Sequence, residues 1–242
     1  MTLKVLLAGQ KHFGAEVFMA LRAVPGVKVA AVSAPTGGDK PDRLWSKADL
    51  YGVPVIKAGA LTAATMPAGI DLIVAAHSHD FIGEKTRLRA KFGGIGYHPS
   101  LLPVHRGRDA VRWAVRMRER VTGGSVYRLS NRMDGGDVLA QEHAFIRPDD
   151  TAEELWRRDL APLGVRLLSE TVGRFAAEGY VHGLAQDEAF ATWEPSIDRP
   201  PAHRPDLLMI EGPRAAPRVW APGTALEDAL RYYGGIFEDA TT

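Results

Sequence analysis

The sequence has no cysteine, no long apolar run and almost no net charge. The absence of cysteine excludes disulfide bonds, thiolate catalysis and metal sites with cysteine ligands. No run approaches the roughly 18 apolar residues of a membrane-spanning helix, and the first apolar run, residues 3–7, is too short for the core of a signal peptide. A formal net charge of +1 offers no general attraction for nucleic acid. We therefore expect a cytoplasmic protein with no membrane-spanning segment.

Two common nucleotide-binding motifs are also absent. The first turn, residues 9–14, reads Gly-Gln-Lys-His-Phe-Gly and departs from the Gly-x-Gly-x-x-Gly pattern that holds a dinucleotide. No Gly-x-x-x-x-Gly-Lys-Ser/Thr loop is present for a nucleoside triphosphate. The sequence therefore gives little support to a dinucleotide or ATP site.

The first half of the chain alternates strand and helix patterns. Five short apolar runs have the length of buried parallel strands: residues 4–8, 27–34, 53–56, 71–76 and 94–97. Between them, helical spacing occurs at residues 12–24, 42–50 and 84–91. This order predicts an α/β fold of the Rossmann-like type, with a mostly parallel sheet and helices on both faces.

The second half predicts two more strands and a long helix. Residues 125–129 and 137–146 have strand patterns, with a tight Gly-Gly turn between them. A capping-box pattern, Thr151 with Glu154, begins a helix that Pro162 is expected to break or kink. Weaker patterns predict a helix at 109–121, a strand at 190–193, a linker at 199–205, a strand at 207–210 and a helix at 226–233.

His98 is the first candidate for chemistry, because it lies where a predicted strand meets a rigid loop. Residues 96–107 read Gly-Tyr-His-Pro-Ser-Leu-Leu-Pro-Val-His-Arg-Gly, and Pro99 and Pro103 exclude a helix there. Ligands of α/β proteins bind at such strand ends. An imidazole titrates near about pH 6.5, which suits proton transfer at neutral pH. A structural histidine in a proline-braced loop is the alternative.

Asp134 is the second candidate, within the motif Met-Asp-Gly-Gly-Asp at residues 133–137. A carboxylate next to an imidazole orients the ring and stabilises its charged form. The glycines allow the backbone to approach a flat ligand closely. Aspartate before glycine is also ordinary turn chemistry. Together, His98 and Asp134 indicate an active site.

A polar group follows the strand pattern at residues 71–76, namely His77, Ser78, His79 and Asp80. On an extended segment the two histidines share one face and Asp80 does not, which favours a loop lining a ligand pocket over a metal site. After the His98 loop, Arg112, Arg116 and Arg120 recur every four residues, which on a helix forms one basic stripe. The stripe is interpreted either as a contact for an anionic substrate or as a solvated surface.

These motifs resemble those of the folate-dependent formyltransferase family. The resemblance lies in His-Pro-Ser-Leu-Leu-Pro at 98–103, Arg-Gly at 106–107 and Met-Asp-Gly-Gly-Asp-Val-Leu at 133–139, and it covers about residues 3–195. The family includes glycinamide ribonucleotide formyltransferase, methionyl-tRNA formyltransferase and the sugar-nucleotide N-formyltransferases. It also includes the N-terminal hydrolase domain of 10-formyltetrahydrofolate dehydrogenase, to which residues 9–17, 52–57 and 97–99 are particularly similar.

The resemblance implies 10-formyltetrahydrofolate as the formyl donor and no metal. It implies that His98 acts as general acid and base, and that Asp134 positions His98 and a water molecule. The folate-binding residues carried over by alignment are Ala76, His77, Ser78, Phe81, Ile82, Arg132 and Met133. Backbone groups of these segments would bond the pterin edge, and Phe81 and Ile82 would supply apolar contact.

One position departs from the family pattern. The family has an asparagine two residues before the histidine, where this chain has Gly96. That asparagine donates a hydrogen bond to the formyl oxygen as it becomes negative, and losing such a donor typically lowers the rate by about 10²–10³. The hydrolase domain also lacks this asparagine. We expect Gly96 to leave a cavity in which water or a substrate group stands.

The expected function is transfer of a formyl group to a small-molecule amine. Hydrolysis of 10-formyltetrahydrofolate to formate is one alternative, and a folate-binding protein with weak or no catalysis is another. An unrelated nucleotide-binding α/β domain is the least supported.

The resemblance divides the chain into a formyltransferase catalytic domain, residues 1–195, and a C-terminal extension of unknown role, residues 196–242. The family's tRNA enzyme has a C-terminal β-barrel for which this extension is too short, and this argues against tRNA as a substrate. The extension is expected either to cover the acceptor site or to form a contact in a homodimer.

Overall fold

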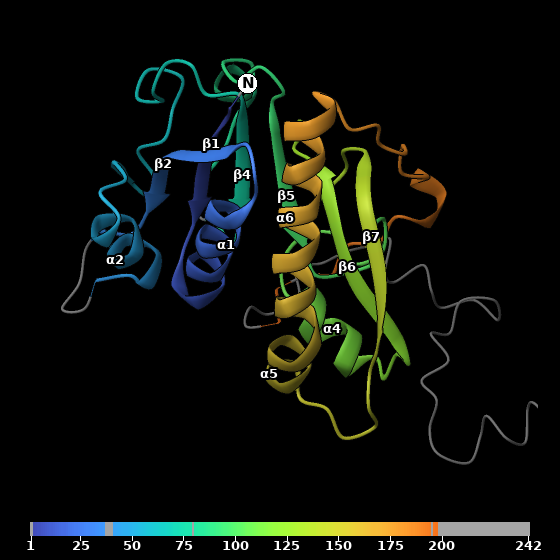
Figure 1. The fold of residues 1–242 in the computed structure, drawn as a ribbon. Helices are drawn as coiled ribbons and strands as arrows, with labels where there is room; N and C mark the ends of the chain where they lie inside the picture. The colour runs from blue at the N-terminus through green and yellow to red at the C-terminus, as the bar shows by residue number, and fades with distance from the viewer. Residues whose placement is uncertain (1, 37–40, 79, 195, 198–242) are drawn as a thin grey trace, which may run out of the picture.

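The computed structural model describes residues 2–36, 41–78, 80–194 and 196–197, which fold around one seven-stranded sheet (Figure 1). The strands are β1 (Leu3–Gly9), β2 (Val27–Ala34), β3 (Val55–Lys57), β4 (Leu72–Ala76), β5 (Gly94–His98), β6 (Val121–Arg128) and β7 (Val138–Phe145). Their order across the sheet is β3-β2-β1-β4-β5-β6-β7. The first five run parallel, and β6 is antiparallel to β5 and β7. The predicted α/β fold with a mostly parallel sheet is confirmed.

The helices cover the two faces of the sheet unequally. They are α1 (Lys11–Ala23), α2 (Arg43–Leu50), α3 (Glu84–Arg87), α4 (Ala110–Arg116), α5 (Ala152–Leu155) and α6 (Ala161–Glu178). On one face, α1 and α6 lie side by side with α2 next to α1, and their apolar side chains form the larger core (Figure 1). The other face is covered by residues 82–90, which include α3, and by the irregular segment 61–70.

The predicted interruption of the long C-terminal helix takes the form of a π-helical turn. The capping box of Thr151 and Glu154 begins α5, as expected. The turn Trp156–Leu160 follows, and Pro162 lies in the first turn of α6, where a missing N–H group is tolerated. The Tyr97 hydroxyl group donates a hydrogen bond of 2.7 Å to the carbonyl oxygen of Leu160. The irregular turn is therefore tied directly to β5.

Three local predictions differ from the structure. Helix α4 ends at Arg116 instead of continuing to 121, because the following residues enter the antiparallel ladder of β6. Arg120 consequently lies outside the helix, and the predicted basic stripe is wrong. The connection between β6 and β7 is a loop longer than the tight turn predicted, although the two strands do pair.

The strand predicted at 190–193 is wrong as well. Residues Glu188–Phe190 form a 3-10 turn, and Trp193 makes a single bridge to Arg106. The predicted linker at 199–205, strand at 207–210 and helix at 226–233 lie outside the described residues.

The carboxyl ends of β1 and β4 mark the point where the strand order reverses, and sheets of this type bind ligands at such a point. The two strands approach closely there, because a Cβ atom on Gly9 would lie 2.5 Å from the carbonyl oxygen of Ala76. The loop after β4 is fixed by Asp80, whose carboxylate accepts 2.6 Å hydrogen bonds from the Ser33 hydroxyl group and the Gly59 N–H. Asp80 therefore ties the described part of this loop to β2 and to the segment after β3.

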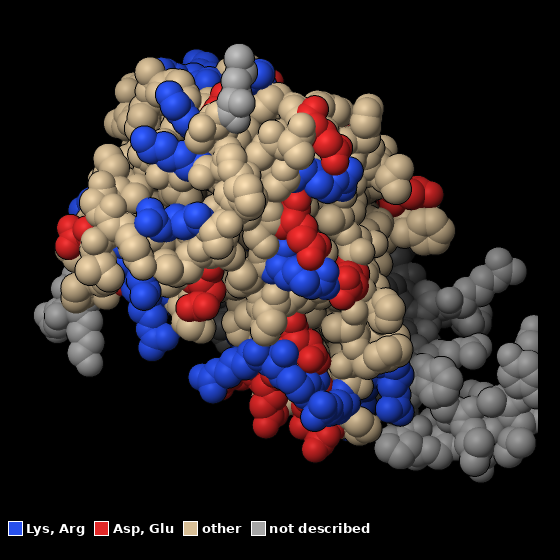
Figure 2. Space-filling model, in the orientation of Figure 1, with Lys and Arg blue, Asp and Glu red and all other residues tan. Residues whose placement is uncertain are grey.

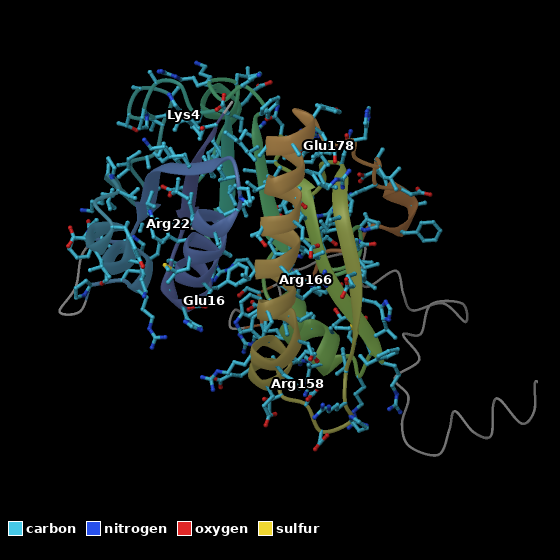
Figure 3. All side chains as sticks on the ribbon, viewed as in Figure 1. Lys4, Glu16, Arg22, Arg158, Arg166 and Glu178 are labelled. Carbon is cyan, nitrogen blue, oxygen red and sulfur yellow. The ribbon has the colours of Figure 1, made fainter. Side chains whose placement is uncertain are left out.

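The surface over α6 carries both signs of charge. Figure 2 shows acidic and basic side chains interspersed along this face, and Figure 3 places Arg166 and Glu178 along the helix and Arg158 in the turn that precedes it. Arg166, for example, lies 2.7 Å from Glu142 of β7 and 3.3 Å from Glu170. Among the described helices, none is both long and apolar enough to cross a membrane.

Candidate active site

His98 is the last residue of β5, as predicted, and its side chain is buried. Its Nε2 atom donates a hydrogen bond of 2.6 Å to the carbonyl oxygen of His105, seven residues further along the same loop. Its Nδ1 atom faces Asp134, with 3.6 Å between Nδ1 and Oδ2. In the neutral ring the unprotonated nitrogen is therefore the one next to the carboxylate. A proton taken up there places the positive charge beside Asp134, which stabilises it.

Asp134 is held by contacts to both of its carboxylate oxygens. Oδ2 accepts a 2.7 Å hydrogen bond from the Gly107 N–H, and Oδ1 accepts one from the Tyr127 hydroxyl group. The residue adopts a left-handed backbone conformation, with φ +48°, which turns its side chain toward His98. The structure thus brings together the two residues that the sequence predicted to form a catalytic pair.

The two segments predicted to bind folate also lie together. Arg87 joins them, because its guanidinium group donates to the carbonyl oxygen of Ile82 at 2.8 Å and to the side-chain oxygen of Asn131 at 2.6 Å. The sulfur atom of Met133 also packs against Gly107 of the His98 loop. A Cβ atom placed on Gly107 would lie 3.3 Å from this sulfur atom. The three loops therefore form one continuous site region.

The individual folate candidates differ in exposure. Ala76 is buried at the end of β4, and His77 is exposed with a left-handed backbone. Ser78 accepts a hydrogen bond from the Asp80 N–H at 3.0 Å.

Phe81 is 91% exposed, whereas Ile82 is packed into the smaller core. Arg132 and Met133 are both exposed. Phe81 and Met133 thus present apolar surface to solvent, while Ile82 supports the loop from below. Their roles as folate ligands remain predictions.

The cavity predicted beside Gly96 does not exist. A Cβ atom on Gly96 would lie 3.2 Å from a ring carbon of Tyr127, 3.3 Å from its hydroxyl oxygen and 3.2 Å from Leu129. The prediction was wrong because neighbouring strand residues fill the space that a missing side chain leaves. An asparagine at this position would have to displace Tyr127.

A C-terminal segment, residues 184–194, clamps the loops that carry His98 and Asp134; we call it the clamp segment. Arg106 is buried and its guanidinium group lies 2.7 Å from the side-chain oxygen of Gln186 and 2.8 Å from Glu188. Gln186 in turn donates to the carbonyl oxygens of Asp134 and Gly136, each at 2.7 Å. One network therefore fixes both loops. The sequence contains no local pattern for it, because its partners are about 80 residues apart.

His105 forms the second link to the clamp segment. Its backbone N–H donates to the Thr192 side chain at 2.8 Å, and its ring nitrogens lie 2.9 Å from Glu119 and 2.9 Å from Glu194. Burial by itself lowers the pKa of His105, but hydrogen bonding and charge from Glu119 and Glu194 outweigh burial and raise this pKa to about 9. His105 is therefore a buried cation between two carboxylates at neutral pH.

The His105 ion pairs predict a pH-dependent stability. Because its pKa is raised on folding, the stabilisation is fully present below about pH 6.5 and is lost as the pH rises through about 9. We expect the free energy of unfolding to fall by on the order of 2 kcal/mol between pH 6.5 and 9.5. Urea denaturation across this pH range measures the free energy of unfolding, with His105→Gln as the comparison. An equal slope in wild type and His105→Gln would contradict the assignment.

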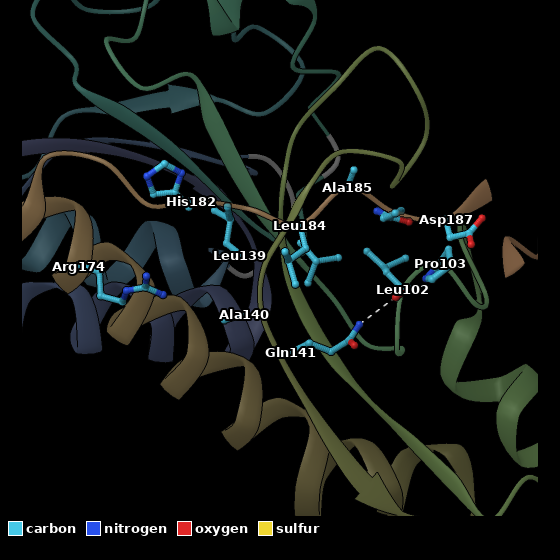
Figure 4. A pocket seen from close by; sticks show the side chains of 12 residues that line it. Leu102, Pro103, Leu139, Ala140, Gln141, Arg174, His182, Leu184, Ala185 and Asp187 are labelled. Atoms are coloured by element: carbon cyan, nitrogen blue, oxygen red, sulfur yellow. Dashed lines mark hydrogen bonds between the residues drawn. The ribbon is translucent and has the colours of Figure 1, made fainter. Parts of the chain in front are cut away.

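A cavity of about 510 Å³ lies behind the His98 loop (Figure 4). Leu102 and Pro103 of that loop line it, with residues of β7 and of the clamp segment. Gln141 supports the loop here, because its amide nitrogen donates to the carbonyl oxygen of Leu102 at 3.0 Å (Figure 4). His98 and Asp134 are not part of its lining. We therefore base the function on the His98–Asp134 pair and not on this cavity.

The fold and site define an α/β protein with a buried imidazole next to a partly buried carboxylate at the carboxyl end of β5. Residues 3–172 match the family model described as formyl transferase. The chain is 33% identical over 202 residues to human cytosolic 10-formyltetrahydrofolate dehydrogenase, covering 79% of this chain and 22% of the relative. It is 37% identical over 155 residues to methionyl-tRNA formyltransferase of Anaeromyxobacter sp. (strain K), covering 62% of this chain and 48% of the relative.

Solved structures of formyltransferases share the fold. Phosphoribosylglycinamide formyltransferase from Bacillus halodurans has a TM-score of 0.61 at 22% identity, over 73% of this chain and 97% of that one. The N-formyltransferase from Helicobacter canadensis, solved with folinic acid and dTDP-3-aminofucose, has a TM-score of 0.65 at 16% identity, over 82% and 73% of the two chains. The chain belongs to the formyl transferase family, whose members use 10-formyltetrahydrofolate as formyl donor. It spans about a fifth of the length of the dehydrogenase relatives.

Proposed function

We propose that this protein moves the formyl group of 10-formyltetrahydrofolate to a small-molecule amine, with His98 and Asp134 as the pair that handles protons. The observation that carries the proposal is the 3.6 Å approach of His98 Nδ1 to Asp134 Oδ2 at the carboxyl end of β5. Family membership supports the donor, and two family members whose structures are similar were solved with folate derivatives.

The reaction exchanges one bond to the formyl carbon for another. The bond to the folate nitrogen breaks, a bond to the amine nitrogen forms, one proton leaves the amine and one is taken up by the folate nitrogen. His98 is suited to accept the first proton at Nδ1 and to deliver it to the leaving nitrogen. Asp134 stabilises the imidazolium between these two events, and the 2.6 Å bond from Nε2 to the His105 carbonyl oxygen keeps the ring oriented.

The donor would lie over the loops that Arg87 joins. We assign its pterin edge to backbone groups of Ala76, His77 and Ser78, and of Arg132 and Met133. The exposed ring of Phe81 supplies apolar contact at the mouth, and Ile82 holds the loop in place. The net charge of +1, and the mixed charges on the face over α6 (Figure 2), favour a small-molecule acceptor over tRNA.

Hydrolysis of the donor to formate is the second candidate, and Gly96 is the observation that favours it. Without a side chain at this position, the site lacks the amide donor that the asparagine of the family would provide. The human relative that is 33% identical is named a 10-formyltetrahydrofolate dehydrogenase. In this reaction water takes the place of the amine and His98 accepts its proton.

A time course with purified protein and 10-formyltetrahydrofolate, without an acceptor, separates the two candidates. We expect tetrahydrofolate to form slowly or not at all until a small amine is added, since transfer requires the acceptor. Following tetrahydrofolate by absorbance and formate enzymatically measures both products. Formate in a one-to-one ratio with tetrahydrofolate, without added amine, would instead make the protein a hydrolase.

A further inference from the structure

Tyr127 contacts the candidate pair from the neighbouring strand. It lies in β6, and its hydroxyl group donates a hydrogen bond to Oδ1 of Asp134. The other carboxylate oxygen, Oδ2, accepts from the Gly107 N–H at 2.7 Å and faces His98. The Tyr127 hydroxyl group therefore fixes the rotation of the carboxylate about its Cβ–Cγ bond. That rotation decides which oxygen is presented to His98.

The position of the Tyr127 ring depends on Gly96. In the ladder between β5 and β6, Gly96 is the residue directly opposite Tyr127. A larger residue at position 96 would project its side chain toward the ring and hydroxyl group of Tyr127. A Cβ atom placed on Gly96 would lie 3.2–3.3 Å from them. Glycine at 96 is thus what allows the Tyr127 ring to pack here and reach Asp134. Glycine at 96 and tyrosine at 127 are therefore structurally coupled, because the Tyr127 ring occupies the space beside Gly96.

Tyr127 is a fixed proton donor in this arrangement. Burial, and then the charge and hydrogen bond of Asp134, raise the pKa of Tyr127 well above its ordinary value. The hydroxyl group therefore stays protonated and keeps donating to Asp134. Other charged or titratable residues near Asp134 include His98 on β5, and Arg106 and Arg132, whose side chains both pack against the adjacent Gly135. Oδ1 itself accepts from the Tyr127 hydroxyl group.

We propose that Tyr127 is a positioning residue of this active site, which holds the Asp134 carboxylate turned toward His98 in a chain that has glycine at position 96. The role of the pair itself rests on the proposed function. The contact of Tyr127 with Asp134 and its effect on the carboxylate do not depend on which formyl acceptor is used. The inference therefore has a measurement that is independent of turnover.

The test compares Tyr127→Phe with Tyr97→Phe, since each variant removes one buried tyrosine hydroxyl group. Tyr97 donates to the Leu160 carbonyl oxygen and not to the pair, so it controls for lost stability. In Tyr127→Phe we expect the Asp134 carboxylate to rotate about its Cβ–Cγ bond, which a crystal structure of the variant shows as a loss of the 3.6 Å approach of Oδ2 to His98 Nδ1. In Tyr97→Phe this approach should be the same as in wild type, although thermal unfolding occurs at lower temperature.

Kinetics provide the second measurement. In Tyr127→Phe we expect kcat to fall about 10- to 100-fold. KM for the folate should stay within about threefold, because Tyr127 is not assigned to the folate contacts. An Asp134 carboxylate that keeps its wild-type orientation in Tyr127→Phe would overturn the proposal. If wild type has no activity with 10-formyltetrahydrofolate, the proposed function fails, and the structural comparison of the two variants still decides the role of Tyr127.

Discussion

Replacing His98 with alanine is expected to abolish formyl turnover while leaving the affinity for 10-formyltetrahydrofolate within a few-fold of wild type. The physical reason is that His98 Nδ1 is the proton acceptor positioned beside the Asp134 carboxylate, at 3.6 Å. The segments assigned to the folate, which Arg87 holds together, do not use the His98 ring. Single-turnover kinetics measure the rate, and fluorescence titration with a non-reactive folate measures the affinity.

The matched control for this prediction is His143→Ala. His143 is exposed on the edge strand β7 and contacts Phe145, so its removal should leave the rate unchanged. Circular dichroism shows whether either variant has lost its fold, because His98 is buried and its ring bonds the His105 carbonyl oxygen. A folded His98→Ala protein that retains wild-type turnover would remove His98 from the mechanism.

Asp134→Asn is expected to lower the rate by roughly 10³- to 10⁴-fold, in line with what an oriented imidazole–carboxylate pair contributes elsewhere. The amide has nearly the same size, but it carries no charge to stabilise the imidazolium. One end of the amide is also a donor, whereas both carboxylate oxygens accept hydrogen bonds, from Gly107 and Tyr127. The substitution therefore removes the charge and mismatches one of these two bonds.

Asp137→Asn is the control for Asp134→Asn, because Asp137 belongs to the same motif but is exposed. It should keep the wild-type rate. The values of kcat and KM should be measured separately, because losing an interaction made only in the transition state lowers kcat. The loss in Asp134→Asn should therefore lie in kcat. A loss confined to KM would show that Asp134 binds substrate and does not support His98.

Several features follow from short stretches of sequence. The apolar runs of β1, β2, β4 and β5 predict buried parallel strands, because strands covered on both faces are continuously apolar. The capping box at Thr151 and the interruption of the helix just before Pro162 are likewise local, since each depends on hydrogen-bonding groups within one or two turns of helix. The placement of His98 at a strand end belongs to the same kind of prediction.

The boundary between α4 and β6 shows where local patterns fail. Residues 109–121 have helical spacing, but Val121 and Thr122 pair with Phe145 and Ala144 of β7. Ladder hydrogen bonds to another strand outweigh the weak helical preference of a few residues. The same competition removes Arg120 from the predicted basic stripe.

What the sequence determined by itself is the fold class, the alternation of strands and helices in its first half, and the identity of His98 and Asp134 as candidates, because each depends on neighbours along the chain. Only the tertiary structure decided how these candidates are held. Tyr127 meets Gly96 through strand register, and Arg106 meets Gln186 and Glu188 across about 80 residues. Such contacts leave no local pattern, because pairing between distant segments is set by how the whole sheet packs. For this reason the sequence predicted an empty space at Gly96, and the folded chain fills it with Tyr127.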